Sequence, residues 1–364
     1  MKILHIITSL RTGGAEKLVS DLLPRLRDRG NSVELLVLDG TETGWLKQIE
    51  DLGIKVIKGR KGAINMWNPL NIFLIRKTVK EGKYDIIHTH NSPAQILTVW
   101  AGVKHLSKLV TTEHNTTNKR RNLKWFRRLD NKIYSAYDLV VCVSPKTREN
   151  LLNSIKIDPQ KVLVILNGID LSKFRKHEAN IAPKSLPPKD KDTKIILMVG
   201  AFRKQKDQPT LIKAMKHLPE NYNLWLAGGW KLRMKSEYLT RELGLEKKVF
   251  FLGERKDIPQ LMNQADVTVL STHYEGMSIA SLECMTSGKP FIATDVPGVR
   301  ELANGAAVLV PENNDKALAV AIKELIKDRK KASEVSKRCI ERAREYDIER
   351  TLNAHISLYN TLCK

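Results

Sequence analysis

Apolar and polar positions alternate along the chain in two ways. Short apolar runs of about four to eight residues predict buried strands, and longer stretches with apolar residues at helical spacing predict helices. In the first half, strands are predicted over 2–8, 32–39, 55–58, 84–90, 108–114, 138–144 and 161–166. In the second half, strands are predicted over 193–200, 222–228, 248–253, 266–272, 290–295 and 306–310. Helical stretches such as 15–29 and 92–105 separate most of these strands.

Regular alternation of strands and helices is typical of a parallel sheet with helices on both faces. A polar stretch rich in proline and lysine, 177–192, interrupts the alternation and indicates a linker. The length of 364 residues also favours two domains over one. We therefore predict an α/β chain with two Rossmann-like, doubly wound domains, 1–176 and 193–346, that face each other across a cleft. Three helices are predicted to end the chain, over 315–327, 330–346 and 347–363, the last within a C-terminal segment 347–364.

The charge balance is the unusual feature of the composition. The chain has 62 lysine and arginine residues against 40 acidic residues, which gives a formal net charge of +22. Such a surplus indicates an anionic partner, either a nucleic acid, a phospholipid surface or an acidic substrate. Most of the surplus lies in two segments of the first half: 55–80 has seven basic residues and no acid, and 115–132 has seven basic residues and one acid.

Other features of the composition limit the choice among these partners. Only 6% of residues are aromatic and no nucleic-acid-binding motif is present, so nucleic acid is not expected as a partner. No apolar run approaches the ~20 residues that span a membrane, and the start of the chain lacks signal-peptide architecture. We expect a cytoplasmic protein, peripheral on the inner face of the plasma membrane. Four cysteines without paired spacing argue against a disulfide framework and a zinc site.

Aromatic residues lie within both basic segments. The predicted basic helix 119–133 has an apolar stripe and places Trp125 among cations at helical spacing. The stripe is Leu123, Phe126, Leu129 and Ile133, and the cations are Arg121, Arg128 and Lys132. An exposed aromatic ringed by cations suits an anionic membrane surface, whereas a solvated helix with Trp125 packed inside fits the pattern about equally well. The stretch 62–75 adds Trp67, Phe73 and Ile75 beside the other basic segment, which favours the membrane interpretation.

The loop 8–16, between the first predicted strand and the first helix, contains Gly13 and Gly14. Paired glycines let the backbone approach a phosphate, and the helix N-terminus adds a favourable partial charge. A tight turn without a ligand is an equal alternative. The loop lacks the GxGxxG pattern, so no dinucleotide cofactor is predicted.

Histidines lie at the ends of two predicted strands. His114 ends 108–114 among polar neighbours, as a residue lining a ligand cleft would, although most isolated histidines are simply packed or exposed. His88 and His90 end 84–90 at a spacing that a metal could use, but no third ligand is evident, so we interpret them as cleft-lining residues. A DxD pattern at 190–192 lies in the lysine-rich linker and is interpreted as linker charge.

Two loops of the second domain carry the most informative chemistry. The loop after strand 193–200 holds Arg203, Lys204 and Lys206, which would neutralise a diphosphate or form a solvated charge cluster. The loop after strand 266–272 holds Glu275, and Glu283 lies in the short helix that follows. Loops at the carboxyl ends of parallel strands bind ligands. Two acids beside the amides of a helix start suit a polyhydroxylated anionic ligand such as a nucleotide sugar.

The order and spacing of these motifs resemble the retaining glycosyltransferases of family 4, which have the GT-B fold and serve polysaccharide and glycolipid biosynthesis. The resemblance covers nearly the full length, through GGAE near the start, TTEHN, NGID at 167–170, GAFRKQKD, FLGERKDIP and ADVTVLSTHYEGMSIASLECMTSGKPFIATDVPGVRE. It implies that the final helix, about 347–363, crosses back to the first domain.

The resemblance also implies roles for individual residues. Glu283 would hold the ribose hydroxyls of the donor, and Glu275 would hold hydroxyls of the transferred sugar. Arg203 and Lys206 would stabilise the leaving diphosphate, and His114 would lie near the sugar and the acceptor. The remaining donor-binding positions are Gly13, Gly14, Gly276, Met277, Ser278 and Ile279.

Two positions depart from the family pattern. Many members have an arginine where this chain has Ala201, and Arg203 would reach the same phosphate from two residues on. Many members have an aromatic residue at the position of Met277, so the sugar pocket would differ.

The predicted activity is that of a hexosyltransferase, EC 2.4. A sugar would pass with retention from a nucleoside-diphosphate sugar to a polysaccharide- or lipid-linked hydroxyl, at the cytoplasmic face of the membrane. A UDP-sugar is favoured as donor, GDP-mannose is the second choice, and neither a cofactor nor a metal is expected. Since no side chain is an obvious covalent nucleophile, retention would come from front-face attack assisted by the departing phosphate. The alternative is a sugar-nucleotide epimerase on the same fold, which needs acids and histidines placed for C–H proton abstraction.

Overall fold

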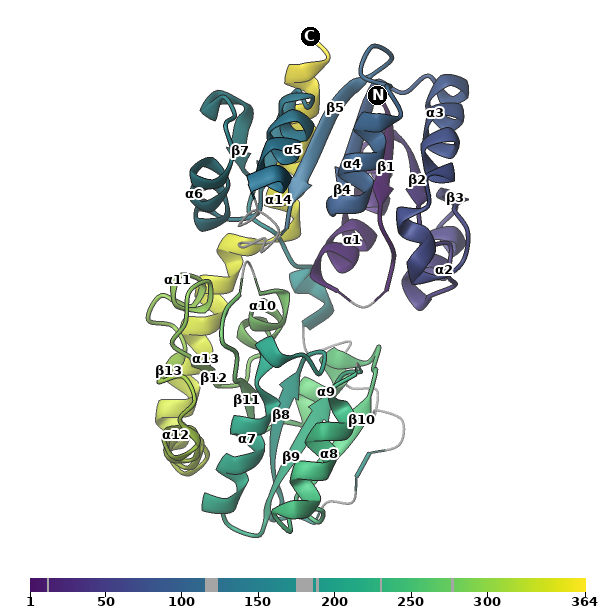
Figure 1. Ribbon diagram of the computed structural model, residues 1–364. Helices are drawn as coiled ribbons and strands as arrows, with labels where there is room; N and C mark the ends of the chain where they lie inside the picture. Colours follow the sequence, from purple (N-terminus) through teal and green to yellow (C-terminus); the bar gives the residue numbers. More distant parts are fainter. Residues whose placement is uncertain (12, 115–123, 175–185, 188–189, 230, 276–277) are drawn as a thin grey trace. The chain divides into compact units, whose positions relative to one another are not determined.

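The computed structural model describes residues 1–11, 13–114, 124–174, 186–187, 190–229, 231–275 and 278–364 (Figure 1). The chain divides into two compact units, Met1–Gly168 with Ile348–Lys364, and Ile169–Asp347. Most of the predicted linker 177–192, and the predicted domain limit at 176, lie outside the described residues. No helix in the described ranges is long and apolar enough to cross a membrane.

The first unit is built on a parallel sheet with the strand order β3-β2-β1-β4-β5-β6-β7. Its described strands are β1 (Lys2–Ile7), β2 (Ser32–Val37), β3 (Lys55–Lys58), β4 (Ile86–His90), β5 (Lys108–Glu113), β6 (Leu139–Cys142) and β7 (Val162–Val164). Its described helices are α1 (Gly14–Asp28), α2 (Gly44–Asp51), α3 (Leu70–Gly82), α4 (Ser92–Trp100), α5 (Lys124–Ser135), α6 (Pro145–Ser154) and α14 (Ile348–Leu362), with 3-10 turns at Ala63–Trp67 and Pro159–Lys161. The strand order reverses between β1 and β4, which is the switch point where open α/β sheets bind ligands.

Alternation along the strands sends apolar residues into a core on each face of this sheet. In β1, Leu4 and Ile6 belong to one core cluster, and Ile3 and Ile7 belong to the other. His5 therefore points to the same face as Ile3 and Ile7. That face is covered by α1 and α14, whose apolar residues share the cluster with Ile3.

The last helix, α14, is part of the first unit although it follows the whole second unit in sequence (Figure 1). Thr351 Oγ1 donates to the carbonyl of Leu166 at 2.8 Å, and Arg29 pairs with Glu349 at 2.7 Å. Gly168 permits the close approach of the two chain segments, because an added Cβ there would lie 2.5 Å from the Cα of Ile348.

The second unit is built on a parallel sheet with the strand order β10-β9-β8-β11-β12-β13. Its described strands are β8 (Lys194–Val199), β9 (Tyr222–Ala227), β10 (Val249–Gly253), β11 (Val267–Leu270), β12 (Phe291–Thr294) and β13 (Val308–Val310). Its described helices are α7 (Gln208–Ala214), α8 (Arg233–Glu242), α9 (Ile258–Gln264), α10 (Ile279–Thr286), α11 (Val299–Ala303), α12 (Asp315–Lys327) and α13 (Arg329–Ala343), with 3-10 turns at Leu171–Phe174, Lys204–Lys206, Met215–His217 and Arg344–Tyr346. The order reverses between β8 and β11.

The two helix-flanked parallel sheets confirm the predicted α/β architecture, and each predicted strand is present. Two helices are shorter than predicted. The helix expected over 92–105 ends at Trp100, because Gly102 has φ +65°, a left-handed conformation that ends a helix. The helix expected over 330–346 ends at Ala343 and tightens into a 3-10 turn, as helix ends often do.

Candidate functional site

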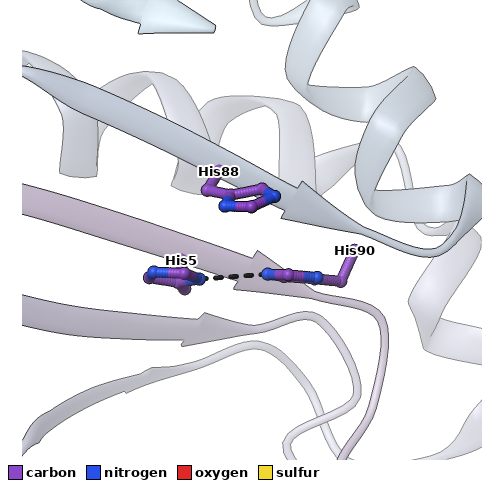
Figure 2. Close-up of side chains that lie close together, drawn as sticks. All are labelled: His5, His88 and His90. Carbon is purple, nitrogen blue, oxygen red and sulfur yellow. Dashed lines mark hydrogen bonds between the residues drawn. The ribbon is translucent and has the colours of Figure 1, made fainter. Parts of the chain in front are cut away.

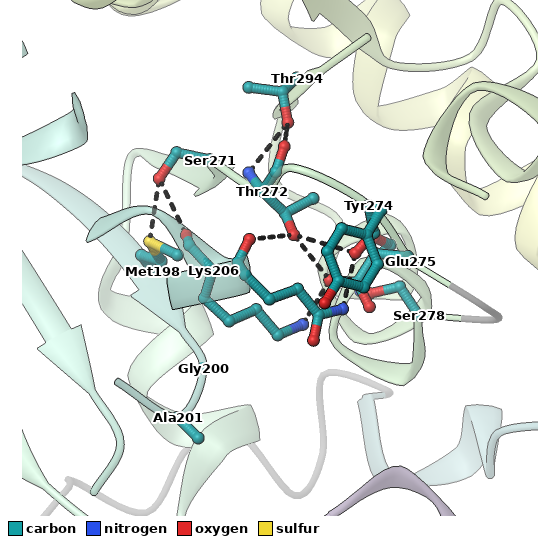
Figure 3. Close-up of polar contacts among 12 residues, drawn as sticks. Met198, Gly200, Ala201, Lys206, Ser271, Thr272, Tyr274, Glu275, Ser278 and Thr294 are labelled. Carbon is teal, nitrogen blue, oxygen red and sulfur yellow. Dashed lines mark hydrogen bonds and ion pairs between the residues drawn. The ribbon is translucent and has the colours of Figure 1, made fainter. Parts of the chain in front are cut away.

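Two loops come together at the switch point of the second sheet. After β8 ends at Val199, the chain passes through an extended Arg203 into the 3-10 turn Lys204–Lys206. After β11 ends at Leu270, the chain runs to Glu275 and then to the start of α10. Because β8 and β11 are parallel neighbours, both loops leave the same edge of the sheet (Figure 3).

Lys206 and Glu275 form an ion pair at this edge. The Lys206 Nζ lies 2.5 Å from Glu275 Oε1, and the two side chains are only 15% and 8% exposed. Thr272 Oγ1 donates to the same carboxylate oxygen at 3.0 Å, and the Gln205 carbonyl, 2.9 Å away, shares this hydroxyl proton. A hydrogen bond to an ionised group is stronger than a neutral one, so two donors orient this carboxylate.

Thr272 is itself held in place by β12 and by the neighbouring loop. Its backbone N–H donates to Thr294 Oγ1 at 2.9 Å, and the Thr294 hydroxyl donates back to the Thr272 carbonyl at 2.5 Å. Gln205 ties the two loops together, since its carbonyl accepts from His273 N at 2.8 Å and its side-chain amide donates to the Tyr274 carbonyl at 2.6 Å. The ion pair therefore sits on a rigid, hydrogen-bonded frame (Figure 3).

The start of α10 lies directly beyond Glu275. Ser278 is the N-cap, and its side chain accepts from Ser281 N at 3.2 Å. Ser278, Ile279 and Glu283 are buried, and Glu283 lies on the second turn of the helix. The predicted donor-binding residues Gly276 and Met277 lie outside the described residues.

The cations of the β8 loop differ in burial. Arg203 and Lys204 are exposed, whereas Lys206 is half-buried. The backbone of this loop approaches the next loop closely, because Phe202 N donates to the Gly229 carbonyl at 2.7 Å. At Gly228 an added Cβ would lie 2.1 Å from the Gly200 carbonyl oxygen, so only glycine fits there. The sequence predicted Arg203 and Lys206 as a pair. The structure brings Lys206 to Glu275, and the role of Arg203 stays a prediction.

The predicted phosphate loop of the first unit is partly described. Gly13 is the N-cap of α1 in extended backbone conformation, and Gly14 is the first residue of the helix. An added Cβ at Gly13 would meet only the end of the Glu16 side chain, at 2.1 Å. Because the end of the Glu16 side chain can move, packing among the described residues does not by itself require glycine at position 13. The donor-binding role of Gly13 and Gly14 stays a prediction.

His114 belongs to a cluster of buried histidines at the switch point of the first sheet. His5 Nδ1 lies 3.0 Å from His90 Nε2, and His90 Nδ1 lies 3.1 Å from His114 Nε2. His88 contacts the Tyr359 hydroxyl at 2.5 Å and Thr112 Oγ1 at 2.7 Å. His355 of α14 packs against His88, with ring centroids 5.6 Å apart.

Burial keeps these imidazoles neutral. It lowers the pKa of His5 to about 3, with a smaller contribution from the charge of His355. It lowers the pKa of His114 to about 4, although the nearby Glu113 carboxylate acts in the opposite direction. Burial also lowers the pKa of His355 to about 4 and places the pKa values of His88 and His90 well below 6.5. At neutral pH each ring therefore carries one N–H and one unprotonated nitrogen.

His5, His88 and His90 have metal-like spacing, with one ring nitrogen of each lying within 4.8 Å of the others (Figure 2). The sequence offered only two of these three. Hydrogen bonds use five of the six ring nitrogens, all except His5 Nε2. A metal ion would have to displace some of these bonds, so the donor set fits neutral, mutually bonded rings better. The absence of a metal requirement stays a prediction.

The aromatic residues of the two basic segments differ in burial. Trp125 is 59% exposed and stacks on Phe126, with ring centroids 3.5 Å apart. The alternative with Trp125 packed inside is therefore wrong. Trp67 and Phe73 are 45% and 68% exposed.

Ile75 does not join these aromatic residues at the surface, as the sequence had suggested. It is fully buried in a core cluster of the first unit, because it lies on the opposite face of α3 from Phe73. Arg121 and Leu123 lie outside the described residues.

Sequence reasoning missed Thr272, Thr294 and His5. Thr272 orients Glu275, Thr294 holds Thr272, and His5 ends the imidazole chain. The available signal was a polar residue within or directly after an apolar strand, which is unusual in a buried parallel sheet.

Known proteins resemble the chain along both units. The family model described as Glycosyl transferases group 1 matches residues 183–346, and the model described as Glycosyltransferase Family 4 matches residues 12–173. The chain is 30% identical over 260 residues to the UDP-Gal:alpha-D-GlcNAc-diphosphoundecaprenol alpha-1,3-galactosyltransferase of Escherichia coli, a match that covers 67% of this chain and 64% of that relative. It is 27% identical over 353 residues to the N-acetylgalactosamine-N,N'-diacetylbacillosaminyl-diphospho-undecaprenol 4-alpha-N-acetylgalactosaminyltransferase of Campylobacter jejuni, with 94% of each chain covered.

A solved structure agrees with the fold. The crystal structure of Anabaena HepE in complex with UDP-glucose superposes with a TM-score of 0.84 at 20% sequence identity, and covers 99% of this chain and 100% of that chain. The chain therefore belongs to the family 4 glycosyltransferases and has the two-domain α/β architecture of the GT-B fold.

Proposed function

We propose that the protein transfers a sugar, with retention, from a nucleoside-diphosphate sugar to a hydroxyl of a lipid-linked or polysaccharide acceptor. The observation that carries the proposal is the Lys206–Glu275 ion pair, 2.5 Å long, at the switch point of the second sheet. A cation suited to a phosphate and a carboxylate suited to sugar hydroxyls are in direct contact there. A nucleotide sugar presents both groups within one small molecule.

The described residues fit distinct parts of such a donor. Glu275 accepts from hydroxyls of the transferred sugar, and its carboxylate is oriented beforehand by Lys206 and Thr272. Glu283 holds the ribose hydroxyls from the buried side of α10, while the amides of Ser278 and Ile279 at the helix start face the anionic part.

The reaction breaks the bond between the anomeric carbon and the distal phosphate oxygen, and it forms a bond from that carbon to the acceptor oxygen on the same face. The electron pair of the broken bond leaves with the diphosphate, whose charge Lys206 and Arg203 stabilise. The proton of the acceptor hydroxyl passes to the departing phosphate. Groups that are oriented before the reaction need little rearrangement as this charge develops. Thr272 contributes to this, because its hydroxyl orients the Glu275 carboxylate before the donor binds.

The names of related proteins support a uridine nucleotide as donor. The Escherichia coli relative uses UDP-galactose by its name, and Anabaena HepE was crystallised with UDP-glucose. We propose a UDP-sugar as the donor of this chain and GDP-mannose as the second choice. Both relatives named above are transferases, and the epimerase alternative gains no support from them.

The acceptor is proposed to be lipid-linked and held at the cytoplasmic face of a membrane. Both relatives act by name on acceptors joined to undecaprenol through diphosphate. The first unit offers exposed aromatic side chains, Trp67, Phe73 and Trp125, within its two basic segments. Exposed aromatics beside cations suit an anionic phospholipid surface.

A donor screen followed by product analysis tests the proposed function. UDP, GDP and their sugars are first compared by thermal shift, and the donors that bind are then incubated with an undecaprenyl-diphosphate-linked sugar in the presence of EDTA. We expect stabilisation by UDP and UDP-sugars, and a glycolipid product with the anomeric configuration of the donor. Stabilisation by none of these nucleotides contradicts the proposal, and conversion of the donor into an epimer without acceptor supports the epimerase instead.

The matched controls for this screen are two Glu→Gln variants. Glu283→Gln should lose the shift given by UDP, whereas Glu242→Gln, an exposed residue of α8, should keep it. Equal loss in both variants would contradict the assigned ribose contact.

A further inference from the structure

A chain of hydrogen-bonded imidazoles runs from the centre of the first sheet to its carboxyl edge. His5 of β1 contacts His90 of β4, and His90 contacts His114 directly after β5, with nitrogen–nitrogen distances of 3.0 and 3.1 Å. The rings of His5 and His90 are nearly parallel, at 8°, and meet edge to edge (Figure 2). The two outer nitrogens, His5 Nε2 and His114 Nδ1, are buried and have no hydrogen-bond partner among the described residues.

Only two proton arrangements satisfy both hydrogen bonds, because each neutral imidazole has one donor and one acceptor nitrogen. In the first arrangement, His5 Nδ1 donates to His90, and His90 Nδ1 donates to His114. The remaining N–H is then on His114 Nδ1. In the second arrangement each proton is on the other nitrogen of its ring, and the remaining N–H is on His5 Nε2.

The surroundings of the two ends distinguish these arrangements. His5 is fully buried in the middle of β1, whereas His114 lies at the edge of the sheet and is partly exposed. A buried N–H without an acceptor is costly and rare in native proteins. In the free protein each arrangement leaves one buried N–H without a partner among the described residues, at His114 Nδ1 or at His5 Nε2. His5 lies in the core, whereas His114 is partly exposed at the edge of the sheet, so the first arrangement places the N–H where an oxygen of water or of a ligand can accept it.

We propose that His90, oriented by His5, is a positioning residue that holds His114 as the Nδ1–H tautomer, so that His114 offers an oxygen of a ligand at the carboxyl edge of the first sheet a hydrogen-bond donor and not a base. The effect of His114 on sugar transfer rests on the proposed function, whereas the tautomer is a property of the protein without substrate. We call His5, His90 and His114 the histidine relay. His88 lies outside it, because its two nitrogens contact Tyr359 and Thr112.

Nitrogen NMR of the full-length protein, labelled with ¹⁵N-histidine and free of ligand, tests the tautomer. Long-range proton–nitrogen correlations at neutral pH should show His114 protonated on Nδ1 and unprotonated on Nε2, with the signals assigned by their loss in His114→Asn. A wild-type His114 protonated on Nε2 overturns the proposal, whatever the behaviour of any variant.

Substitution of the relay tests its cause. His90→Phe keeps a ring and removes the donor to His114 Nε2, so His114 should change to the Nε2–H form. His90→Asn returns an amide donor to the position of Nδ1 and should restore the Nδ1–H form. His355→Phe is the matched control, because this buried histidine bonds the Thr351 carbonyl and not the relay. His114 that stays Nδ1–H in folded His90→Phe, or that changes equally in His355→Phe, overturns the proposal.

Kinetics separate this inference from the proposed function. His90→Phe should lower kcat/KM for sugar transfer about fivefold, the effect of one misdirected neutral hydrogen bond, and His90→Asn should recover it. UDP affinity should be the same in all of these variants. A protein with the expected tautomer and no sugar transfer contradicts the proposed function and supports the relay, whereas full transfer activity in folded His90→Phe overturns the relay.

Discussion

Lys206 Nζ lies 2.5 Å from Glu275 Oε1, and both side chains are largely shielded from water. The two residues are 69 positions apart and meet because β8 and β11 are adjacent at the switch point of the sheet. In a shielded site, each charge depends on the other for stability, because removal of one partner leaves the other desolvated. The pair that we propose to bind the donor therefore also stabilises the free protein.

A double-mutant cycle on this pair tests that dual role. Lys206→Met should lower the free energy of unfolding by about 2 kcal/mol, because it leaves the Glu275 carboxylate without its cation. The double variant Lys206→Met, Glu275→Gln should recover most of the loss, because no buried charge remains. Urea denaturation measures all four proteins, and a double variant as unstable as the sum of the two single variants would show that the residues do not interact.

Thr272→Val tests the frame that orients Glu275. Valine matches threonine in shape and lacks the hydroxyl that donates to Glu275 Oε1 at 3.0 Å. A lost hydrogen bond to a charged group corresponds to about a tenfold or greater fall in kcat/KM. The control is Thr268→Val on β11, whose hydroxyl donates to the Pro290 carbonyl at 3.2 Å and also bonds the Cys284 thiol, but does not contact Glu275. Equal activity of the two variants would remove Thr272 from the site.

Sequence periodicity predicted the architecture of this chain well. Buried parallel strands give continuous apolar runs, and turns between them concentrate polar residues, so each strand of both sheets was found. The carboxyl-edge rule also placed Lys206 and Glu275 on loops of one edge. Their direct contact could not be predicted, because it depends on the neighbour relation of β8 and β11.

The histidine relay was harder to predict for a similar reason. His5 lies in an apolar run and gives no periodic signal, and its partners are 85 and more residues away. Helix α14 covers the same face of the sheet and shields the histidine cluster from water. This helix follows the whole second unit in sequence, so its position was not evident from the periodicity of the sequence. Long-range pairings of this kind become visible only in three dimensions.

The buried histidines should make stability depend on pH. In the unfolded chain they take up protons as the pH falls below about 6.5, whereas in the folded chain His5 remains neutral down to a pKa of about 3 and His114 down to about 4. The unfolded state therefore binds more protons in this window. The free energy of unfolding should fall with decreasing pH by up to about 1.4 kcal/mol per pH unit for each such histidine.

Urea denaturation between about pH 7 and pH 5 measures this dependence above the range where most carboxylates titrate. His355→Phe should make the slope shallower, because one proton-binding site of the unfolded chain is removed. His105→Gln, an exposed histidine in the same unit, should leave it unchanged. A stability that stays constant across this range would contradict the neutral state of the cluster.

The two glutamates around the start of α10 should have separable effects. If Glu283 holds the ribose as we propose, Glu283→Ala should weaken UDP binding about tenfold or more, because the ribose loses hydrogen bonds to a charged group. Glu275→Ala should mainly lower kcat, because its proposed contact is with the sugar that changes in the reaction. Isothermal titration with UDP and steady-state kinetics separate the two, and equal UDP affinity in both variants would contradict the assignment.

Membrane docking should depend on the exposed aromatics of the first unit. Trp67→Ser and Phe73→Ser remove apolar area within the basic segment 55–80 without touching the core, because both side chains are exposed. Each should reduce cosedimentation with vesicles rich in phosphatidylglycerol, and added salt should weaken the wild type further, since phospholipid charge contributes to binding. Tyr238→Ser on α8, which removes an exposed aromatic from the second unit, should bind as the wild type does. Equal binding by all of these proteins, or binding that neutral phosphatidylcholine vesicles support as well, would contradict docking through this surface.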